Sequence, residues 1–527
     1  MNSINRIIYC IIDDVRADQF FKLIDEGWLP NFKKFYEKGI FSKNCVTDFP
    51  AVTYPTQVSM ITGTHTGSYQ KELCHGVPLY NWMERAVAPP FLRSYGTYGS
   101  DERIQIYKMN DDIGTNCQTI LEMIKEGNKA SILQYISRGT DYFYPESKMK
   151  LAFFYLLLKN SRNVERYLYR INSLVVQKTI ETFNHPKKFF DSNEVPIASL
   201  LWFVSSDILL HLFGSNSKQY LQNLIHIDTV FGILLKKLDQ MGYLDDTAIA
   251  VSSDHGNYAA KTFGNLSPFI QKHNLHNYHP RKNVNGIINI TDMGGIGFIN
   301  VKPRLCYSKS YWNPPKIKDL ENFGPNGINL LKELFKIKGC QLMYYKDDNN
   351  GVSKGKIYLK RKLPNLDKKI LGCLEYRGQG RDFRIKYSNQ NQDEDIFGYY
   401  KDEKAAKLMD DKFHTPNEWL EHTYHIHYPC YPELVSRHFK NPRGGDIIIS
   451  TKGSVVYSIT HGKQGKINPY GHDLGSKNCT IVPLIIGGAP EIPQKEVDFC
   501  KTVDIVPTLL KLIQVKPHKS VMGQSLI

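Results

Sequence analysis

The chain has 527 residues, of which 41% are hydrophobic and 23% are charged, so its composition excludes a mostly disordered protein. At about 100–200 residues per domain, this length predicts two to four units, or one large core that carries insertions. Lysine and arginine outnumber aspartate and glutamate by 67 to 52, which gives a net charge of +15. Because the basic residues are scattered, we predict a solvated basic surface and no dedicated nucleic-acid binding.

The apolar stretches of the chain predict no membrane span. The longest of them, Leu151–Leu158 and Ile197–Val204, fall far below the roughly 18 residues that a span requires. The first apolar stretch meets Asp13 and Asp14 too early to be the core of a signal peptide. The ten cysteines are dispersed, without the paired spacing of a zinc ribbon. These features favour a cytoplasmic protein with reduced thiols.

The first 60 residues predict a strand, a helix, a second strand and a second helix. Arg6–Ile12 is nearly all apolar, as expected of a buried parallel strand. Tyr220–Gln240 repeats apolar residues at helical spacing, and Thr247–Ser252 follows it as another buried strand. Near the carboxyl terminus, Asp446–Ser450 and Ile481–Gly487 also have the pattern of strands. This alternation predicts an α/β core with a doubly wound, mostly parallel sheet and helices on both faces.

Two regions interrupt the alternation. Residues 130–195 are rich in aromatic, leucine and basic residues and predict extra helices. Residues 296–440 contain short alternating strands such as Lys354–Lys362, and we interpret them as a large α+β insertion. Such an insertion would form a cap over the carboxyl ends of the core strands, where open α/β sheets bind ligands. We therefore expect the first part of the core at 1–295, the cap at 296–440, and the final core strands and helix at 441–527.

Metal-ligating side chains follow four of the predicted core elements. Because the carboxyl ends of parallel strands meet at one edge of a sheet, we expect these side chains to lie close together. Carboxylate oxygens combined with imidazole nitrogens suit zinc, manganese or iron better than calcium. The candidate ligands are Asp13, Asp14, Asp207, His211, Asp254, His255, His461 and His472.

Thr53 is a candidate nucleophile. It precedes Pro55 and the apolar stretch Val58–Thr62, so its hydroxyl lies at a predicted helix N-terminus. That position suits a simple helix cap, and it equally suits the binding of a phosphoryl group by the helix dipole. A threonine alkoxide beside a metal ion is a competent nucleophile. The neighbouring Tyr54 would either stack on a nucleoside base or pack in the core.

Taken together, these segments resemble the alkaline phosphatase superfamily. Within it, the chain most resembles the type I phosphodiesterase/nucleotide pyrophosphatase branch and its phosphonoacetate hydrolase relatives. The resemblance covers the core and excludes the two insertions. It rests on the segments IIYCIIDDVRAD, TYPTQVSMITG, SDILLHLFG, SSDHG, YGHDLGSKNCTIVPLIIGG and TVDIVPTLLKLI, which occur in the family's order.

The resemblance implies a hydrolase that cleaves phosphodiester or nucleotide-type pyrophosphate bonds in a small anionic phosphorylated substrate. It implies catalysis through a phospho-threonine intermediate on Thr53, at a site for two divalent metal ions. We expect these ions to be zinc, with manganese as the alternative. The implied ligands are Asp13, Thr53, Asp254 and His255 for one ion and Asp207, His211 and His472 for the other.

Some positions depart from the family's pattern. Asp14 stands where relatives usually have glycine, and it is either a partner of a ligand or a spare ligand. His461 competes with His472, which we prefer because the segment VPLII begins ten residues later, as it does in relatives. Relatives also carry an asparagine that contacts the phosphoryl oxygens shortly after a His-Gly dipeptide, and this implies the same role for Asn81.

The same fold leaves other functions open. A phosphomonoesterase, a phosphonate hydrolase or a phosphomutase would use a similar site, and the arginines of the cap suit the second phosphate of a mutase. A sulfatase is disfavoured, because Thr53 and Gln57 replace the cysteine or serine and the arginine of its motif. A non-catalytic, metal-occupied binding protein is the alternative from another class.

Overall fold

The computed structural model describes residues 4–95, 105–147, 163–347, 351–363, 369–390, 394–457 and 469–527. The apolar run Leu151–Leu158 and the alternative ligand His461 lie outside the described residues. Within these ranges, every helix is too short or too polar to cross a membrane.

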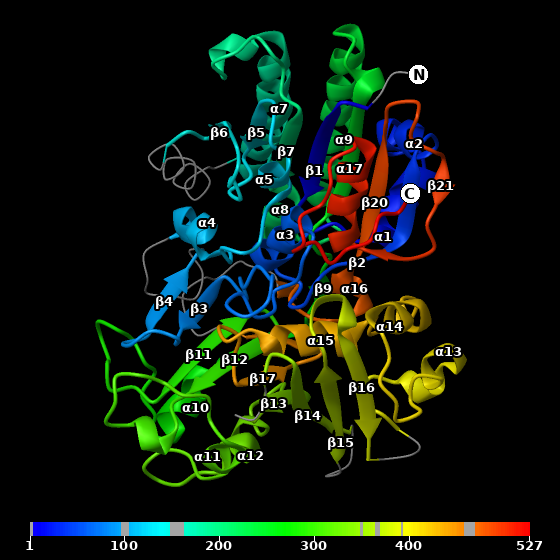
Figure 1. The fold of residues 1–527 in the computed structure, drawn as a ribbon. Coiled ribbons are helices and arrows are strands. Elements are labelled where there is room, and N and C mark those ends of the chain that lie inside the picture. Colours follow the sequence, from blue (N-terminus) through cyan, green and yellow to red (C-terminus); the bar gives the residue numbers. More distant parts are fainter. Residues whose placement is uncertain are drawn as a thin grey trace.

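Within the described residues, the core of the protein is one nine-stranded sheet (Figure 1). Its strands are β1 (Arg6–Ile12), β2 (Ile40–Val46), β5 (Lys129–Ile132), β6 (Tyr142–Tyr144), β7 (Ala198–Phe203), β8 (Thr247–Ser253), β20 (Ile481–Gly488), β21 (Lys495–Glu496) and β22 (Cys500–Lys501). They follow the order β21-β2-β20-β8-β1-β7-β5-β6, and β22 also pairs with β2. The strands from β8 to β6 are parallel, whereas β20 runs antiparallel to both of its neighbours. The predicted α/β class with a mostly parallel sheet is confirmed.

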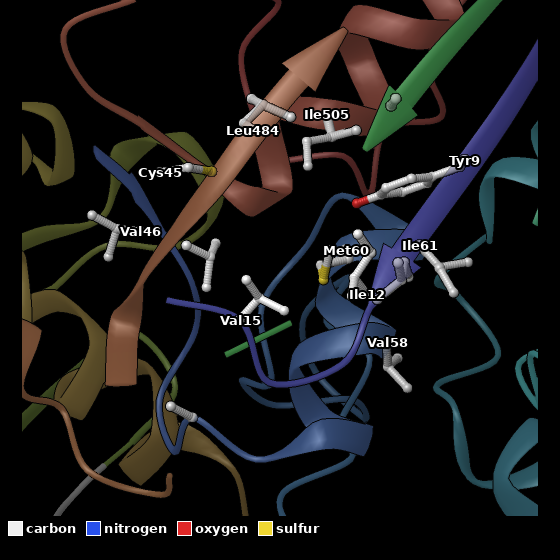
Figure 2. Packing of buried hydrophobic residues seen from close by; sticks show 14 of the residues in the cluster. Tyr9, Ile12, Val15, Cys45, Val46, Val58, Met60, Ile61, Leu484 and Ile505 are labelled. Carbon is white, nitrogen blue, oxygen red and sulfur yellow. The ribbon is translucent and has the colours of Figure 1, made fainter. Parts of the chain in front are cut away.

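Helices cover both faces of this sheet. One group consists of α1 (Ala17–Asp25), α2 (Pro30–Tyr36), α7 (Val164–Asn184) and α9 (Lys218–Gln240), and another of α3 (Thr53–Thr62) and α17 (Ile505–Leu512). Figure 2 shows Tyr9 of β1 pointing toward α3 and α17, whose Met60 and Ile505 belong to the same buried cluster. Apolar residues on both sides of β1 are therefore removed from water, which explains its nearly continuous apolar sequence.

The region 130–195 is less helical than its composition predicts. Its first part contributes β5 and β6 to the edge of the core sheet, and only then does the long helix α7 begin. The backbone of β5 pairs in parallel with β7, with Lys129 opposite Ala198. Strands of three or four residues are too short to show a period of two, so the sequence pattern does not reveal them.

A second sheet, antiparallel throughout, lies beside the core (Figure 1). Within the described residues it has the order β11 (Ile288–Met293), β12 (Ile296–Val301), β17 (Ile447–Ser450), β13 (Leu342–Lys346), β14 (Lys354–Lys362), β15 (Lys369–Arg377) and β16 (Arg384–Asn389). The expectation that residues 446–450 form a core strand is wrong, because β17 pairs with β12 and β13. An apolar run shows that a strand is buried, but it does not show which sheet supplies its partners.

The helix α15 (Tyr431–Lys440) lies between the two sheets (Figure 1). All of its residues are buried, although four of them are ionisable: Glu433, Arg437, His438 and Lys440. The helix packs on β15 and β16, and its charged side chains pair with residues of the core. The second sheet is therefore joined to the core through a buried polar contact as well as through apolar packing.

Candidate active site

The candidate ligands meet at the carboxyl edge of the core sheet. Asp13 directly follows β1, and Asp254 directly follows β8. Asp207 and His211 lie on α8 (Ser205–Phe213), which begins just after β7 ends. Because β20 runs antiparallel, the segment before it reaches this same edge and brings His472 there. The parallel strands end, and the antiparallel strand begins, at the same edge of the sheet. Ligands that are distant in sequence therefore converge there.

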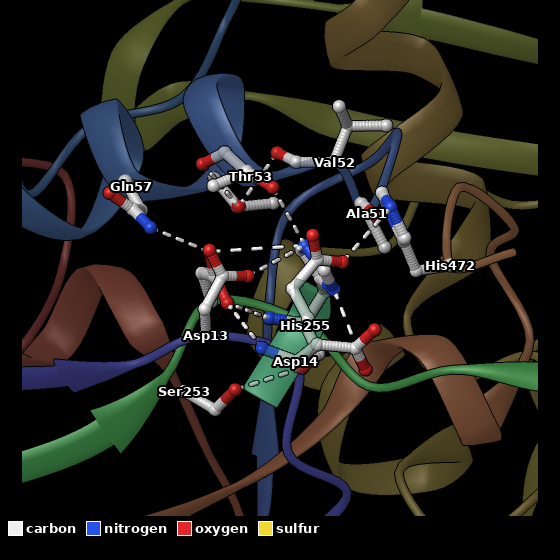
Figure 3. A network of polar contacts seen from close by, with 12 residues as sticks. Asp13, Asp14, Ala51, Val52, Thr53, Gln57, Ser253, His255 and His472 are labelled. Atoms are coloured by element: carbon white, nitrogen blue, oxygen red, sulfur yellow. Dashed lines mark hydrogen bonds and ion pairs between the residues drawn. The ribbon is translucent and has the colours of Figure 1, made fainter. Parts of the chain in front are cut away.

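These side chains form two overlapping sets of possible metal ligands. One set contains Asp13, Asp254 and His255, and the other contains Asp207, His255 and His472. Within each set, the donor atoms lie within 4.8 Å of one another. His211 contacts the second set through Asp207, with its Nε2 atom 3.2 Å from Oδ1 of that residue. Figure 3 shows how several of these side chains approach one another from separate segments.

Thr53 is the first residue of α3 and is buried beside both sets. Its Oγ1 atom lies 3.1 Å from Nε2 of His255, the residue that the two sets share (Figure 3). The hydroxyl of Tyr80 donates a second hydrogen bond to this Oγ1, over 2.9 Å. The structure therefore places a threonine hydroxyl at the N-terminus of a helix and between the two groups of ligands.

The four carboxylates of this edge have no cationic side chain as a partner. Among the described residues, Asp13, Asp14, Asp207 and Asp254 form ion pairs with histidines and with no lysine or arginine. Burial raises the pKa of Asp13 well above its usual range, and repulsion from Asp254 raises it further. Burial likewise raises the pKa of Asp254 to about 6. Within the described residues, no lysine or arginine therefore compensates the negative charge of the carboxylates at this edge of the sheet.

His255 and His472 are poised to offer lone pairs, whereas the pKa of His211 is raised. Burial lowers the pKa of His255 to about 4 and that of His472 to about 3, so both imidazoles are neutral near pH 7. Burial alone would raise the pKa of Asp207, but the imidazole of His211 and then that of His472 lower it. Asp207 also raises the pKa of His211 against the opposing effect of burial.

Neighbouring groups orient the ligands toward the centre of the site. The Nδ1 atom of His472 lies 3.0 Å from the carbonyl oxygen of Ala51, and Nδ1 of His255 lies 3.2 Å from that of Gly256. Because a carbonyl only accepts, each Nδ1 carries the proton, and each Nε2 keeps a lone pair. Fixing a ligand histidine through its other nitrogen is typical of metal sites.

The ligand carboxylates are held in the same way. The indole N–H of Trp202 donates to Oδ2 of Asp13 over 3.1 Å, and the amide of Gln57 donates to Oδ2 of Asp254 over 2.7 Å. The Oδ1 atom of Asp13 is buried and accepts no hydrogen bond from any described residue. Leaving such an atom unsatisfied is costly unless a cation binds it. The donor set and this orphaned oxygen together fit a divalent metal ion.

Asp14 differs from the ligands in its backbone conformation. Its φ angle is 56°, in the left-handed region where glycine is the usual residue. Its carboxylate accepts a hydrogen bond of 2.7 Å from the amide of Asn257, and its backbone N–H donates to Asp254. The glycine usual in relatives is compatible with this geometry, and Asp14 contacts a ligand rather than joining either ligand set.

Sequence reasoning missed Tyr80 and Trp202, and it noted Gln57 near Thr53 without foreseeing its bond to Asp254. Gln57 stands one helical turn after Thr53, so its position on the same face of α3 was a usable signal. Trp202 and Tyr80 come from other segments, and nothing in their local sequence indicates a contact with Asp13 or Thr53.

Asn81 and Tyr54 are buried, and the role of Asn81 toward the phosphoryl oxygens stays a prediction. Asn81 is the buried first residue of β3 (Asn81–Glu84) and pairs with Ser94 of β4 (Phe91–Ser94). Tyr54 is only 4% exposed, and its ring packs against Tyr80 at a centroid distance of 4.5 Å. Of the two roles considered for Tyr54, the structure therefore supports packing in the core.

Comparison with known proteins identifies the family. Residues 8–316, more than half of the chain, match the family described as type I phosphodiesterase / nucleotide pyrophosphatase. The chain belongs to this family of metal-dependent enzymes that hydrolyse phosphodiester and pyrophosphate bonds. The resemblance stated from the motifs is confirmed.

Solved structures share the fold over nearly the whole chain. Human ectonucleotide pyrophosphatase/phosphodiesterase 5 has a TM-score of 0.56 at 13% identity, and the match covers 97% of this chain and 95% of that one. The murine protein gives 0.54 at 13% identity, with 97% and 96% covered. An inactive murine variant with threonine replaced by alanine, in complex with AMP, gives 0.55 at 12% identity and the same coverage.

Proposed function

We propose that this enzyme hydrolyses phosphodiesters or nucleotide-type pyrophosphates through a phospho-threonine intermediate on Thr53. The observation that carries the proposal is the position of Thr53 Oγ1, 3.1 Å from Nε2 of His255, which belongs to both ligand sets. The complex of the murine protein with AMP supports a nucleotide-type substrate for this chain. The inactivity of the threonine-to-alanine variant of that protein supports a threonine nucleophile.

We further infer that the site holds two divalent metal ions, and that these are zinc. Asp13, Asp254 and His255, with Thr53, would hold one ion, and Asp207, His211 and His472 would hold the other. Mixed carboxylate and imidazole donors suit zinc, and manganese is the alternative. When bound, such ions lower the pKa of an adjacent hydroxyl and neutralise the charge that develops on the phosphoryl oxygens.

The protein's own contribution is to position the nucleophile and its surroundings. Oγ1 of Thr53 would attack phosphorus while the positive end of the α3 dipole faces the phosphoryl oxygens. Trp202 holds Oδ2 of Asp13 and leaves its Oδ1 3.5 Å from Nε2 of His255, and Gln57 holds Asp254 through Oδ2. Entry would occur beside Asp207 and His211, whose side chains are 17% and 31% exposed, whereas Asp13 and His255 are buried.

The surroundings of Thr53 favour a diester over a monoester. Within the described part of the chain, the polar contacts of the Thr53 side chain come from His255 and Tyr80 and include no lysine or arginine. A monoester dianion usually requires an additional cation near the nucleophile, whereas a diester carries one charge less. We therefore propose that diester or pyrophosphate hydrolysis exceeds monoester hydrolysis.

The nucleophile is tested by Thr53→Ala, with Thr62→Ala at the far end of the same helix as the control. Thr62 bonds the carbonyl of Val58 and the thiol of Cys117, neither of which is a ligand, so the variant should keep parental activity. Thr53→Ala should abolish turnover and keep its metal, because the carboxylates and imidazoles remain. Intact mass measurement of rapidly acid-quenched parental enzyme should show one added phosphoryl or nucleotidyl group. Parental turnover by Thr53→Ala would mean that water attacks phosphorus directly.

The substrate class is tested with a diester and a monoester that share one leaving group. The diester should have the higher kcat/KM. A monoester preference of more than about tenfold, roughly 1.4 kcal/mol in transition-state energy, would replace our proposal with a phosphomonoesterase or phosphomutase.

We also propose that the protein is cytoplasmic. The ten cysteines are free thiols, and Cys45 and Cys500 remain so although they lie opposite each other on β2 and β22. Dispersed thiols without paired spacing are in keeping with a reducing compartment. Cell fractionation, with thiol alkylation before lysis, would contradict this if the protein were exported or if this pair were oxidised.

A further inference from the structure

Tyr80 approaches the nucleophile from outside the metal-ligand sets. Its hydroxyl donates to Oγ1 of Thr53 over 2.9 Å, and it precedes the strand that begins at Asn81. The other polar contact of Oγ1 is Nε2 of His255, 3.1 Å away. Since Nδ1 of His255 donates to the carbonyl of Gly256, its Nε2 accepts a hydrogen bond from the Thr53 hydroxyl in this structure. Oγ1 thus donates toward His255 and accepts from Tyr80.

This arrangement leaves Oγ1 with one lone pair for attack. Once its proton has left, Oγ1 has three lone pairs: Tyr80 would engage one and the metal ion that Thr53 would hold a second, which fixes the direction of the third. After the Oγ1–phosphorus bond forms, the bridging oxygen becomes a poor acceptor. The non-bridging phosphoryl oxygens then lie beside it and carry the charge. A neutral phenol within hydrogen-bond distance of Oγ1 is also within reach of one of these oxygens.

The ring of Tyr80 is held by packing that also reaches a metal ligand. Tyr54 lies between Tyr80 and Trp202, with ring centroids 4.5 Å and 6.4 Å away. Trp202 in turn donates to Oδ2 of Asp13. One aromatic layer therefore positions a donor to the nucleophile and a donor to a ligand carboxylate, and it keeps the phenol beside Thr53.

We propose that Tyr80 orients Thr53 Oγ1 for attack and then donates its hydrogen bond to a non-bridging oxygen of the transferred group. Tyr80 would thereby take the role that the resemblance implies for Asn81. The proposal rests on the phosphoryl transfer proposed above. In that step, the Oγ1–phosphorus bond forms as the bond to the leaving group breaks, and the leaving oxygen departs with the electron pair. The Thr53 proton has already passed to solvent, and Tyr80 keeps its own proton throughout.

The experiment compares Tyr80→Phe with the parental enzyme, using the metal-loaded full chain and a diester. Phenylalanine keeps the ring that packs on Tyr54 and removes only the donor. The loss of one such donor should lower kcat by about 10- to 1,000-fold. KM should change by less than about threefold, and metal content should stay at the parental value. Inhibition by orthovanadate, which resembles the transition state at Thr53, should weaken more than inhibition by phosphate.

Tyr95→Phe is the matched control. Tyr95 belongs to the same aromatic cluster, with its ring centroid 5.8 Å from that of Tyr54, but its hydroxyl donates to Asp112. Its replacement should lower the melting temperature and leave kcat and the vanadate-to-phosphate ratio at parental values. A drop in kcat of equal size in both variants would show a merely structural effect and overturn the proposal.

Asn81→Ala tests whether Tyr80, as proposed, or Asn81, as the resemblance implies, is the donor to the phosphoryl oxygens. The proposal expects a smaller loss of kcat for Asn81→Ala than for Tyr80→Phe, and the reverse order would overturn it. If Thr53→Ala abolishes turnover while Tyr80→Phe keeps parental kcat and vanadate inhibition, the role of Tyr80 is wrong and the proposed function stands. If Thr53→Ala keeps parental turnover, the phospho-threonine route fails, and the role of Tyr80 fails with it.

Discussion

Two buried regions of this protein are rich in carboxylates, and they differ in what surrounds them. The carboxyl edge of the core sheet gathers four aspartates without lysine or arginine partners among the described residues. The contact between the two sheets, which we call the interlobe ion-pair network, gives every carboxylate a cation. Its pairs are Glu433 with Arg437 and Lys501, Glu72 with Lys440, Glu84 with Arg443, and Asp446 with Arg85.

The pKa values of Glu433 and Asp13 shift in opposite directions. Burial alone would raise the pKa of Glu433, but Lys501 and then Arg437 lower it well below its usual range. The pKa of Asp13 is raised by burial and raised again by Asp254. In the interlobe ion-pair network, lysine and arginine side chains compensate the buried carboxylates. At the carboxyl edge of the core sheet, the carboxylates are left for an external cation. The difference indicates that the network serves the folded state, whereas the edge serves binding at a cost in stability.

The largest expected effect that separates the regions is on activity. Asp13→Asn should lower kcat/KM by at least about 1,000-fold, because the loss of a ligand removes the metal-dependent steps. The same change should stabilise the metal-free protein by about 1 kcal/mol, since it removes a buried carboxyl group whose ionisation burial and Asp254 oppose. Activity assays, elemental analysis and urea unfolding in chelator would measure both effects. Full activity in Asp13→Asn would remove this residue from the site.

Glu433→Gln should have the opposite effect on stability. It leaves Arg437 and Lys501 buried without their carboxylate, and breaking such a pair costs about 3–5 kcal/mol. Urea unfolding of the metal-free protein would measure the change. Glu26→Gln is the control, because its pair with Lys22 is exposed and should contribute less than about 1 kcal/mol. Equal stabilities of the two variants would contradict the proposed division between the regions.

Metal addition should stabilise the protein through the carboxyl edge of the core sheet and not through the interlobe ion-pair network. Zinc at 100 times its dissociation constant should stabilise the metal-free parental protein by about 2.7 kcal/mol, if it binds the folded state alone. It should have the same effect on Glu433→Gln and a much smaller effect on Asp13→Asn. Thermal unfolding with and without zinc would test this expectation. An equal response of all three proteins would place the binding of zinc elsewhere.

The smallest effect is the pH dependence of the network. Because the folded pKa of Glu433 lies below its unfolded value, its contribution to stability is fully present above about pH 4.3. That contribution is lost as the pH falls toward the folded pKa. The difference in unfolding free energy between the parental protein and Glu433→Gln should therefore shrink below about pH 4.3 and stay constant from pH 6 to pH 8. A difference independent of pH from 3 to 8 would contradict the ionised pairing of Glu433.

Local sequence determined the core elements and the chemistry of their ends. The apolar run of Arg6–Ile12 predicted β1 with its exact bounds, because a strand covered on both faces must be apolar. Asp13 and Asp254 were identifiable because carboxylates directly after such strands stand at the binding edge. Thr53 was identifiable from the helix that it begins. The role of each as a ligand or nucleophile stays a prediction.

Only the tertiary structure decided which distant residues complete these elements. Tyr80 and Trp202 contact Thr53 and Asp13 across 27 and 189 positions in the chain, and no local pattern encodes such pairs. The strand Ile447–Ser450 joined the second sheet because its backbone pairs with β12 and β13, although its apolar sequence suited either sheet. Local sequence specifies burial and backbone preference, whereas long-range packing selects the partner, because that choice depends on shape and hydrogen bonding between segments that meet only in the folded chain.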